Sequence, residues 1–270
     1  MNKDNLKGYF EGSKLYGDDF SLNEIKKWFK DEKEAYFNNL VAKNIKDYKY
    51  NYHALNYEKG FRFLPNKRFS HVLGVGSAYG REFIPISKRV DKFTILEPSE
   101  GFVVKEINSK PVNYVKPKMN GEFPFASNSF DLITCFGTLH HISNVNKILK
   151  EIYRCLKRNG YALIREPIVS MGDWRTFRKG LTKRERGIPL KFFHNMISLK
   201  GFQIIKEQMC IFPLIVRLRH FMNKPVYNSK FAVFLDNILC CLFAWNYNYH
   251  PTNLFKKLRP VSIFYVLHKK

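Results

Sequence analysis

The chain has 270 residues and is 45% hydrophobic, which is enough to bury the core of one α/β domain with additional segments and excludes a wholly disordered protein. Its 46 Lys and Arg residues against 23 Asp and Glu residues give a formal net charge of +23, which favours anionic partners such as nucleic acid, acidic or phosphorylated substrates, or an anionic membrane face. A solvated, lysine-rich surface would explain the same charge without any partner.

Residues 1–62 predict a helical extension ahead of the main domain. Ser21 and Glu24 form a capping box at the start of the helical stretch 22–45. Residues 1–14 contain no apolar run of signal-peptide length, so we expect a protein that is not secreted.

Residues 63–270 alternate between short apolar strands and helices. This pattern predicts an α/β fold with a Rossmann-like, doubly wound, mostly parallel seven-stranded sheet. Residues 144–160 predict an amphipathic helix that is closed by Gly160. The expected strands are residues 71–75, 92–97, 112–115, 130–136, 161–166, 202–207 and 262–268.

A helical insertion at about residues 210–259 separates the last two strands. It is aromatic and basic, and we expect two helices in it that form either a cap or lid or a membrane-facing surface. Its apolar run, residues 231–245, contains Asp236 and is too short for an ordinary transmembrane helix. The five cysteines form no C-x-x-C pair, so we expect reduced thiols, no metal site and a cytoplasmic protein, with peripheral contact to the inner face of the membrane left open.

The stretch "HVLGVGSAYG", residues 71–80, places Gly74, Gly76 and Gly80 after the first strand and before an expected helix. Such a turn lets the backbone approach a ligand and directs helix N–H groups at it. Glu97 ends the next strand, where a carboxylate can accept hydrogen bonds from both hydroxyls of a ribose. Because ligands bind beyond the carboxyl ends of parallel strands, these residues predict a nucleoside site.

A third feature indicates which nucleoside is bound. "FPFASNSFDLITCFGTLHHI" (residues 123–142), the helix after it and "LKRNGYALIREP" (residues 156–167) follow one another as in the class I S-adenosylmethionine-dependent methyltransferase family (methyltransferase type 11-like). Residues 65–170 resemble that family, which implies a methyltransferase with S-adenosyl-L-methionine as its cofactor. The resemblance implies cofactor contacts from Gly74, Gly76, Ser77, Gly80, Glu97, Met119, Asn120 and Phe136.

Three positions depart from the pattern of that family. Gly74 stands where an acidic residue is usual, Ala78 where glycine is usual, and Met119 where an aspartate commonly contacts adenine. These departures leave open a protein that has the cofactor fold but no catalytic activity.

Candidate catalytic residues follow the strands at 130–136 and 161–166. Removing the proton of an acceptor hydroxyl requires a general base within hydrogen-bond reach. His141 is the first candidate, Glu166 is the second, and Asp173 is expected to orient the acceptor or to pair with a neighbouring arginine. A purely structural role for the histidine pair is the alternative.

The basic segment at 165–189 is the main indication of the substrate. Its arginines are suited to bidentate binding of carboxylate or phosphate, and its tryptophan offers a flat face for a sugar. A solvated loop with an internal ion pair is the alternative. The segment resembles one in methyltransferases of bacterial surface-polysaccharide (O-antigen) assembly, which implies O-methylation of a sugar hydroxyl in an anionic glycan, glycolipid or nucleotide-sugar. The expected substrate contacts are His140, Arg165, Trp174, Arg175, Arg178, Arg184 and Arg186.

Two other methyltransferase classes fit parts of the sequence. An RNA methyltransferase would use the positive charge, but no RNA-binding module or RNP-type motif is recognisable, which makes nucleic acid a weaker expectation. A methyltransferase for small, lipophilic, quinone-type acceptors would explain the apolar insertion. The sequence makes no prediction of the oligomeric state.

Overall fold

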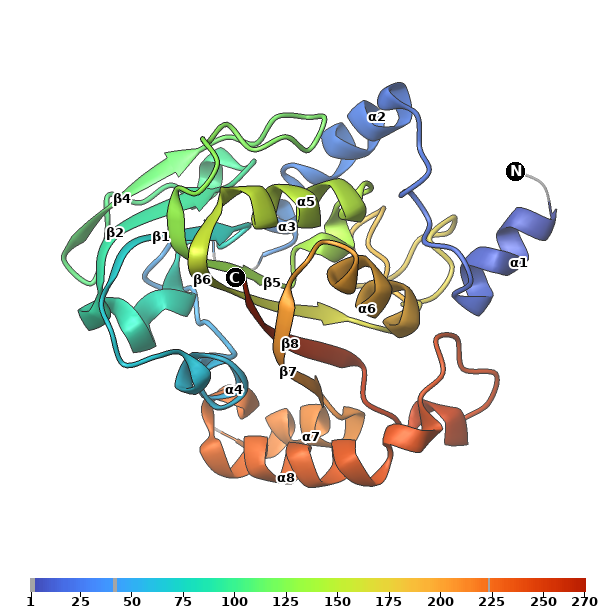
Figure 1. Ribbon diagram of the computed structural model, residues 1–270. Helices are drawn as coiled ribbons and strands as arrows, with labels where there is room; N and C mark the ends of the chain where they lie inside the picture. The colour runs from blue at the N-terminus through green and yellow to red at the C-terminus, as the bar shows by residue number, and fades with distance from the viewer. Residues whose placement is uncertain (1–2, 41–42, 223) are drawn as a thin grey trace.

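The computed structural model describes residues 3–40, 43–222 and 224–270, and an eight-stranded sheet lies at its centre (Figure 1). The strands are β1 (Phe69–Val75), β2 (Val90–Leu96), β3 (Glu106–Ile107), β4 (Lys110–Val115), β5 (Phe130–Phe136), β6 (Leu156–Pro167), β7 (Gln203–Cys210) and β8 (Ser262–His268). Their order across the sheet is β3-β4-β2-β1-β5-β6-β8-β7. The pairs from β4 to β6 are parallel, whereas β8 is antiparallel to both β6 and β7. The seven predicted strands are all present, and the two-residue β3 adds an eighth.

Two helix predictions differ from the structure. After the glycine loop the chain forms 3-10 turns over Arg81–Arg89 (η2), with Pro85 inside them, in place of the expected α-helix. Proline has no N–H to donate, so a regular helix cannot continue through it. The amphipathic helix α5 (Val145–Cys155) ends where β6 begins, which places Gly160 inside a strand rather than at a helix terminus.

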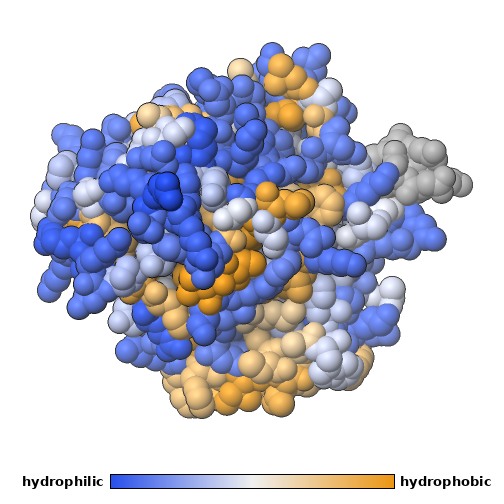
Figure 2. Space-filling view, viewed as in Figure 1, coloured by the Kyte–Doolittle hydropathy of each residue, from blue (hydrophilic) through white to orange (hydrophobic). Residues whose placement is uncertain are grey.

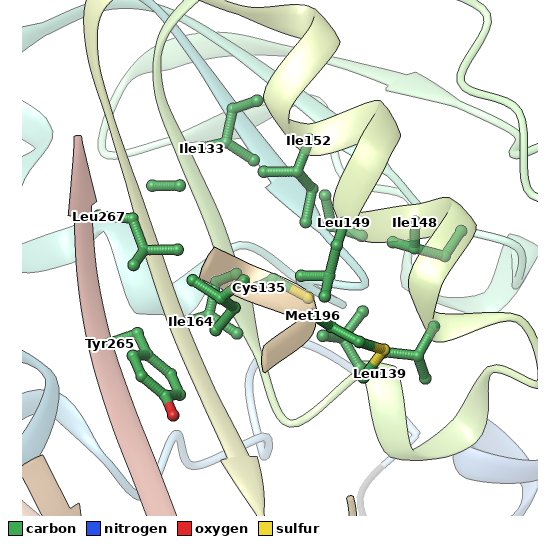
Figure 3. Packing of buried hydrophobic residues seen from close by; sticks show 14 of the residues in the cluster. Ile133, Cys135, Leu139, Ile148, Leu149, Ile152, Ile164, Met196, Tyr265 and Leu267 are labelled. Carbon is green, nitrogen blue, oxygen red and sulfur yellow. The ribbon is translucent and has the colours of Figure 1, made fainter. Parts of the chain in front are cut away.

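The hydrophobic core covers both faces of the sheet, as expected for strands that are apolar along their whole length. Figure 3 shows one face, where Ile133 and Ile164 of the sheet pack against Ile152 of α5 and Met196 of α6 (Leu190–Ser198). On the other face, strand residues pack against α4 (His53–Lys59) and the insertion. The central strands are therefore held rigidly, with only their ends free to meet a ligand.

The N-terminal extension contains α1 (Lys3–Glu11), α2 (Leu22–Glu32), α3 (Ala35–Asn39) and α4. The predicted capping box is confirmed, because the Ser21 side chain accepts from the Glu24 N–H and the Glu24 side chain accepts from the Ser21 N–H. Figure 1 shows the extension in blue, running from α1 on one side of the domain to α4 beside the insertion on the other. The extension thus wraps around the sheet domain.

The insertion contains α7 (Pro213–Arg217) and α8 (Lys230–Leu242), which confirms the expected pair of helices. Helix α8 packs on α4 and β7 (Figure 1). Its buried Asp236 accepts from the N–H groups of Ile211 and Phe212 and from the Tyr227 hydroxyl, so the acid inside the apolar run anchors the insertion. Among the described residues, no helix has the length and apolar character needed to cross a bilayer.

Candidate active site

A cavity of about 610 Å³ lies beyond the carboxyl ends of β1, β2, β5 and β6. This volume is typical of a site for a small organic ligand. One wall comes from α2, α3 and residues 48–52, so the N-terminal extension is part of the site rather than an appendage. Within the described part of the insertion, no residue between 210 and 259 lines the cavity. The expectation that the insertion caps the site is therefore wrong, because it packs on the sheet face instead.

The glycine loop contributes residues 76–78 to the cavity. Gly76 has a φ of +64°, and a Cβ there would lie 2.3 Å from Cγ2 of Thr138, so no side chain fits. Ala78 also takes a positive φ, +48°, which keeps the left-handed turn at the position where glycine was expected. Gly74 and Gly80 do not line the cavity; a Cβ on Gly74 would lie 2.1 Å from the Ser77 hydroxyl oxygen. Gly74 and Gly80 thus allow close packing around the loop and do not contact the cavity.

Glu97 lies where the sequence placed it, at the carboxyl end of β2 and facing the cavity. Its carboxylate accepts hydrogen bonds from the N–H groups of Ala78 at 3.1 Å and Ser99 at 3.2 Å. Burial raises the pKa of this carboxyl to about 7, although both hydrogen bonds oppose the increase. The Glu97 carboxyl thus gains or loses its proton near neutral pH, and it accepts hydrogen bonds more strongly when it is ionised.

Glu82 and Arg165 place opposite charges in the cavity, and sequence reasoning missed the first of them. Glu82 is buried, accepts from the Ser77 hydroxyl at 3.1 Å, and has a pKa that burial raises to about 7. The acid that is absent at Gly74 is thus supplied from η2, eight residues further along the chain. Arg165 is 5% exposed, and its guanidinium carbon is 3.8 Å from the centre of the Tyr52 ring. Its buried Nη1 has no hydrogen-bond partner.

Of the remaining cofactor candidates, Phe136 and Met119 line the cavity and Asn120 does not. Met119 is 44% exposed, at the cavity edge. The Asn120 side chain accepts from the N–H of Glu122, and its carbonyl accepts from the Asn144 amide, so it shapes the turn instead of facing a ligand.

Glu166 is completely enclosed and orients the histidine turn, η4 (Leu139–His141). Its carboxylate accepts from the N–H groups of Thr138 and Leu139 at 2.8 Å each and from Nδ1 of His140 at 2.8 Å. It is absent from the cavity lining, which corrects its assignment as a second candidate base. Glu166 is a positioning residue, since all its hydrogen-bonding capacity is used within the turn.

His140 faces the cavity between two carboxylates. Nδ1 contacts Glu166, and Nε2 lies 3.4 Å from Oε1 of Glu185. Burial alone would lower the pKa of His140, but hydrogen bonds to both carboxylates outweigh it and raise the pKa to about 9. The same pairing lowers the pKa of Glu185 to about 2, against the effect of its own burial. At neutral pH His140 is therefore a cation and not a proton acceptor.

His140, His141 and Glu185 are close enough to be considered as metal ligands, since their donor atoms lie within 4.8 Å of one another. Both ring nitrogens of His140 are already directed at carboxylates, however, and a proton completes that arrangement. A metal ion would have to displace this proton and break the contact to Glu185. The donor set thus fits an ion-pair network better than a cation site.

His141 has the geometry of a general base. Its Nδ1 lies 2.9 Å from Oε2 of Glu32 and 3.2 Å from the Thr182 hydroxyl. Because a carboxylate only accepts, Nδ1 carries the proton of the neutral ring, which leaves the lone pair on Nε2. Nε2 has no partner among the described residues, and His141 lines the cavity.

Helix α2 holds this arrangement in place. The indole N–H of Trp28 donates to the His141 carbonyl at 2.6 Å, and Glu32 also accepts from the Arg184 N–H at 2.7 Å. No sequence motif marks Glu32, which lies 109 residues before His141. Only the fold brings the two together.

The structure corrects the expected positions of several substrate contacts in the basic segment. Trp174 is buried, with its ring centre 4.4 Å from that of Tyr16, and Asp173 forms an ion pair with Arg175 at 2.6 Å. Neither Trp174 nor this pair lines the cavity. Arg184 pairs with Asp31 of α2 at 2.8 Å. Trp174 and Arg184 thus fasten the segment to the extension, whereas Asp173 and Arg175 pair within the segment.

Arg178 and Arg186 are bound to backbone carbonyls. Arg178 donates to the carbonyls of Met171, Thr182, Lys183 and Glu185 and so closes its own loop. Arg186 is completely buried and donates to the carbonyls of Tyr16, Leu139, His140, Ile142 and Ser143. Among the described residues, the lysine and arginine side chains that do line the cavity are Lys33, Lys49, Lys118 and Arg165.

Comparison with known proteins agrees with this geometry. Residues 73–164 match the family model described as a methyltransferase domain. An uncharacterized protein of Methanocaldococcus jannaschii is 37% identical over 81 residues, covering 30% of this chain and 32% of that protein. The demethylmenaquinone methyltransferase of Lactobacillus johnsonii is 26% identical over 143 residues, covering 45% of this chain and 56% of that protein. The chain thus spans less than two thirds of the length of these curated relatives.

Solved structures share the fold. Phosphoethanolamine N-methyltransferase 2 of Haemonchus contortus, in complex with S-adenosyl-L-methionine, superimposes with a TM-score of 0.58 at 16% identity, covering 93% of this chain and 60% of that chain. The predicted Rossmann-like methyltransferase fold is confirmed by this likeness.

Proposed function

Since residues 73–164 form a methyltransferase domain, we propose that this chain is an S-adenosylmethionine-dependent O-methyltransferase that acts on a sugar hydroxyl of an anionic glycan, glycolipid or nucleotide-sugar. The observation that carries the reaction type is His141, whose Nδ1 is fixed by Glu32 while Nε2 is available in the cavity. The proposal places the protein in the cytoplasm, at the inner face of the membrane.

The residues present fit the cofactor. Gly76 brings the backbone of the glycine loop to the cavity, and Glu97 has the position to accept from ribose hydroxyls. The unpartnered Nη1 of Arg165 and the carboxyl of Glu82 match the carboxylate and amino groups of an amino-acid moiety. When bound, S-adenosylmethionine supplies a methyl group on a sulfonium for in-line displacement.

The chain's own residues prepare the acceptor for that displacement. Nε2 of His141 takes the proton of the acceptor hydroxyl as its oxygen becomes nucleophilic. Glu32 keeps the ring in one tautomer and stabilises the imidazolium that forms. The positive charge of His140 stays on that residue, bound between Glu166 and Glu185, so the two histidines have different roles.

A sugar acceptor is supported by the mixed lining of the cavity. Tyr36 and Tyr50 offer flat faces, while asparagine and carboxylate groups offer hydrogen bonds for hydroxyls. Lys33 and Lys49 at the exposed edge are suited to a phosphate or carboxylate, a role that the sequence assigned to the arginines. In this proposal the N-terminal extension, and not the 165–189 segment, binds the anionic group of the substrate.

A lipophilic, quinone-type acceptor is the second candidate. The aromatic share of the lining favours it, as does the similarity to a demethylmenaquinone methyltransferase. A labelled-methyl transfer assay with nucleotide-sugars, lipid-linked glycans and reduced quinones, read by mass spectrometry, separates the two. Methylation of quinones alone would overturn the sugar proposal, and binding of S-adenosylmethionine without transfer to any acceptor class would overturn catalysis.

As the pH falls below 7, the affinity for S-adenosylmethionine is expected to fall by up to about tenfold per pH unit for each carboxylate of the free protein that takes up a proton. The pKa values of Glu97 and Glu82 are raised to about 7, so the free protein binds protons there that the ligand must displace. Calorimetry between about pH 5 and 8 measures this slope. Glu97→Gln should bind more weakly at pH 8 and lose its share of the slope; an unchanged profile would remove Glu97 from the ribose site.

Arg165→Met is expected to raise the Kd for S-adenosylmethionine by about tenfold to a hundredfold, because a hydrogen bond from a charged donor to a carboxylate is lost. Arg175→Met, in the same segment but outside the cavity, should leave the Kd unchanged. If Arg165→Met raises only the KM of the acceptor, Arg165 serves the substrate, as the sequence predicted.

A further inference from the structure

Helix α8 exposes an apolar stripe that the core does not use. Phe231, Phe234, Ile238 and Leu242 are 69%, 59%, 41% and 61% exposed, and Trp245 just beyond the helix is 70% exposed. Their spacing of three and four residues puts them along one side of the helix. In Figure 2 this side forms a mostly apolar area along the lower edge of the molecule, where Figure 1 places α8. We call these five residues the α8 face.

The opposite side of α8 is already buried. Ala232, Val233 and Cys240 pack into the core, and Asp236 is hydrogen-bonded to Phe212 and Tyr227. The helix is therefore anchored in its orientation, and the α8 face cannot turn inward. An exposed apolar area of this kind on a rigid element is typical of an interaction surface.

Exposed basic side chains accompany the α8 face in the same segment. Residues 210–259 contain one acidic residue, Asp236, and it is buried. The exposed basic residues described in this segment are Arg217, Arg219, Lys224, Lys230, Lys256 and Lys257. The segment thus combines an exposed apolar helix face with exposed positive charge and no exposed negative charge among its described residues.

We propose that the α8 face docks on an anionic lipid bilayer, with α8 lying in the plane of the interface. Aromatic side chains enter the boundary between headgroups and acyl chains, and the exposed lysines and arginines of the segment contact anionic headgroups. Lys230, beside Phe231, places its ammonium group 6.0 Å from the centre of the Tyr57 ring. A helix of 13 residues is too short to span the bilayer, so the contact is peripheral.

Charge also argues against a second copy of this chain as the occupant. Two α8 faces brought together would juxtapose two sets of like charges without exposed acidic residues from the insertion to offset them. An anionic membrane has the complementary charge. The inference goes beyond the proposed methyl transfer and holds whether or not the acceptor is known, since docking needs no catalysis.

The test is sedimentation of the full chain with vesicles of phosphatidylcholine alone or mixed with phosphatidylglycerol. Binding is expected for the mixed vesicles and is expected to weaken with salt. Phe231→Ser with Phe234→Ser should lower the partition coefficient at least tenfold, and Lys256→Gln with Lys257→Gln about tenfold on anionic vesicles only. The matched control is Phe177→Ser with Leu199→Ser, which removes two side chains that are 91% and 82% exposed elsewhere.

Unchanged thermal unfolding and S-adenosylmethionine affinity in all three double variants would show that folding is intact. Three outcomes would overturn the proposal: no binding of the unmodified chain to anionic vesicles at low salt, equal loss in the control, or a dimer in light scattering that Phe231→Ser with Phe234→Ser dissolves. The last would assign the α8 face to a second copy. Failure of methyl transfer would leave this result untouched.

Discussion

His141→Ala is expected to lower kcat by about a hundredfold to ten-thousandfold and to leave the Kd for S-adenosylmethionine unchanged. In the proposed mechanism Nε2 of His141 accepts the proton, since both nitrogens of His140 are paired with carboxylates. Single-turnover methyl transfer measures kcat, and calorimetry measures the Kd. His194→Ala, on the exposed side of α6, is the control and should retain full activity.

Glu32→Gln separates orientation from chemistry. The amide keeps the shape of the side chain but removes the charge that stabilises an imidazolium, so kcat should fall less than in His141→Ala and its pH profile should shift. Equal kcat for His141→Ala and the unmodified chain would reduce the histidine to a structural role.

Arg186→Met is expected to lower the free energy of unfolding by about 3–5 kcal/mol. The buried guanidinium is the hydrogen-bond donor for five backbone carbonyls, four of them in residues 139–143. Methionine leaves the carbonyls of Tyr16 and Ile142 without a donor among the described residues and the other three with one backbone donor each. Chemical denaturation measures the change, and Tm should fall by about 10 °C.

Arg175→Met is the matched control for stability. It removes an exposed arginine from the same segment, together with its ion pair to Asp173, and should change stability by no more than about 0.5 kcal/mol. If Arg186→Met instead keeps full stability and raises only the KM of the acceptor, Arg186 is the substrate contact that the sequence predicted.

Local patterns predicted the sheet well. The seven strands follow from apolar runs, and the place of Glu97 follows from the rule that ligands bind at the carboxyl ends of parallel strands. The α-helix predicted after the glycine loop does not form, because Pro85 interrupts it. The helix predicted to end at residue 160 ends at Cys155, because β6 begins at Leu156.

The walls of the site were less predictable. The sequence around a loop arginine does not show whether the side chain binds a ligand or a backbone carbonyl. The position of the Arg186 side chain depends on acceptors at Tyr16 and in the histidine turn, which are far away in sequence. Glu82 and Glu32 carried no motif, since their roles depend on the tertiary neighbours Ser77 and His141. Composition cannot show such pairings.

Glu32 and His141 are far apart in sequence, so their pairing depends on the docked extension. The carboxylate lies 109 residues before the imidazole that it orients, and the two meet only where α2 packs beside η4. A chain with a detached extension would keep the glycine loop and Glu97 but would lack this carboxylate. Docking of α2 is thus needed to complete the proposed base.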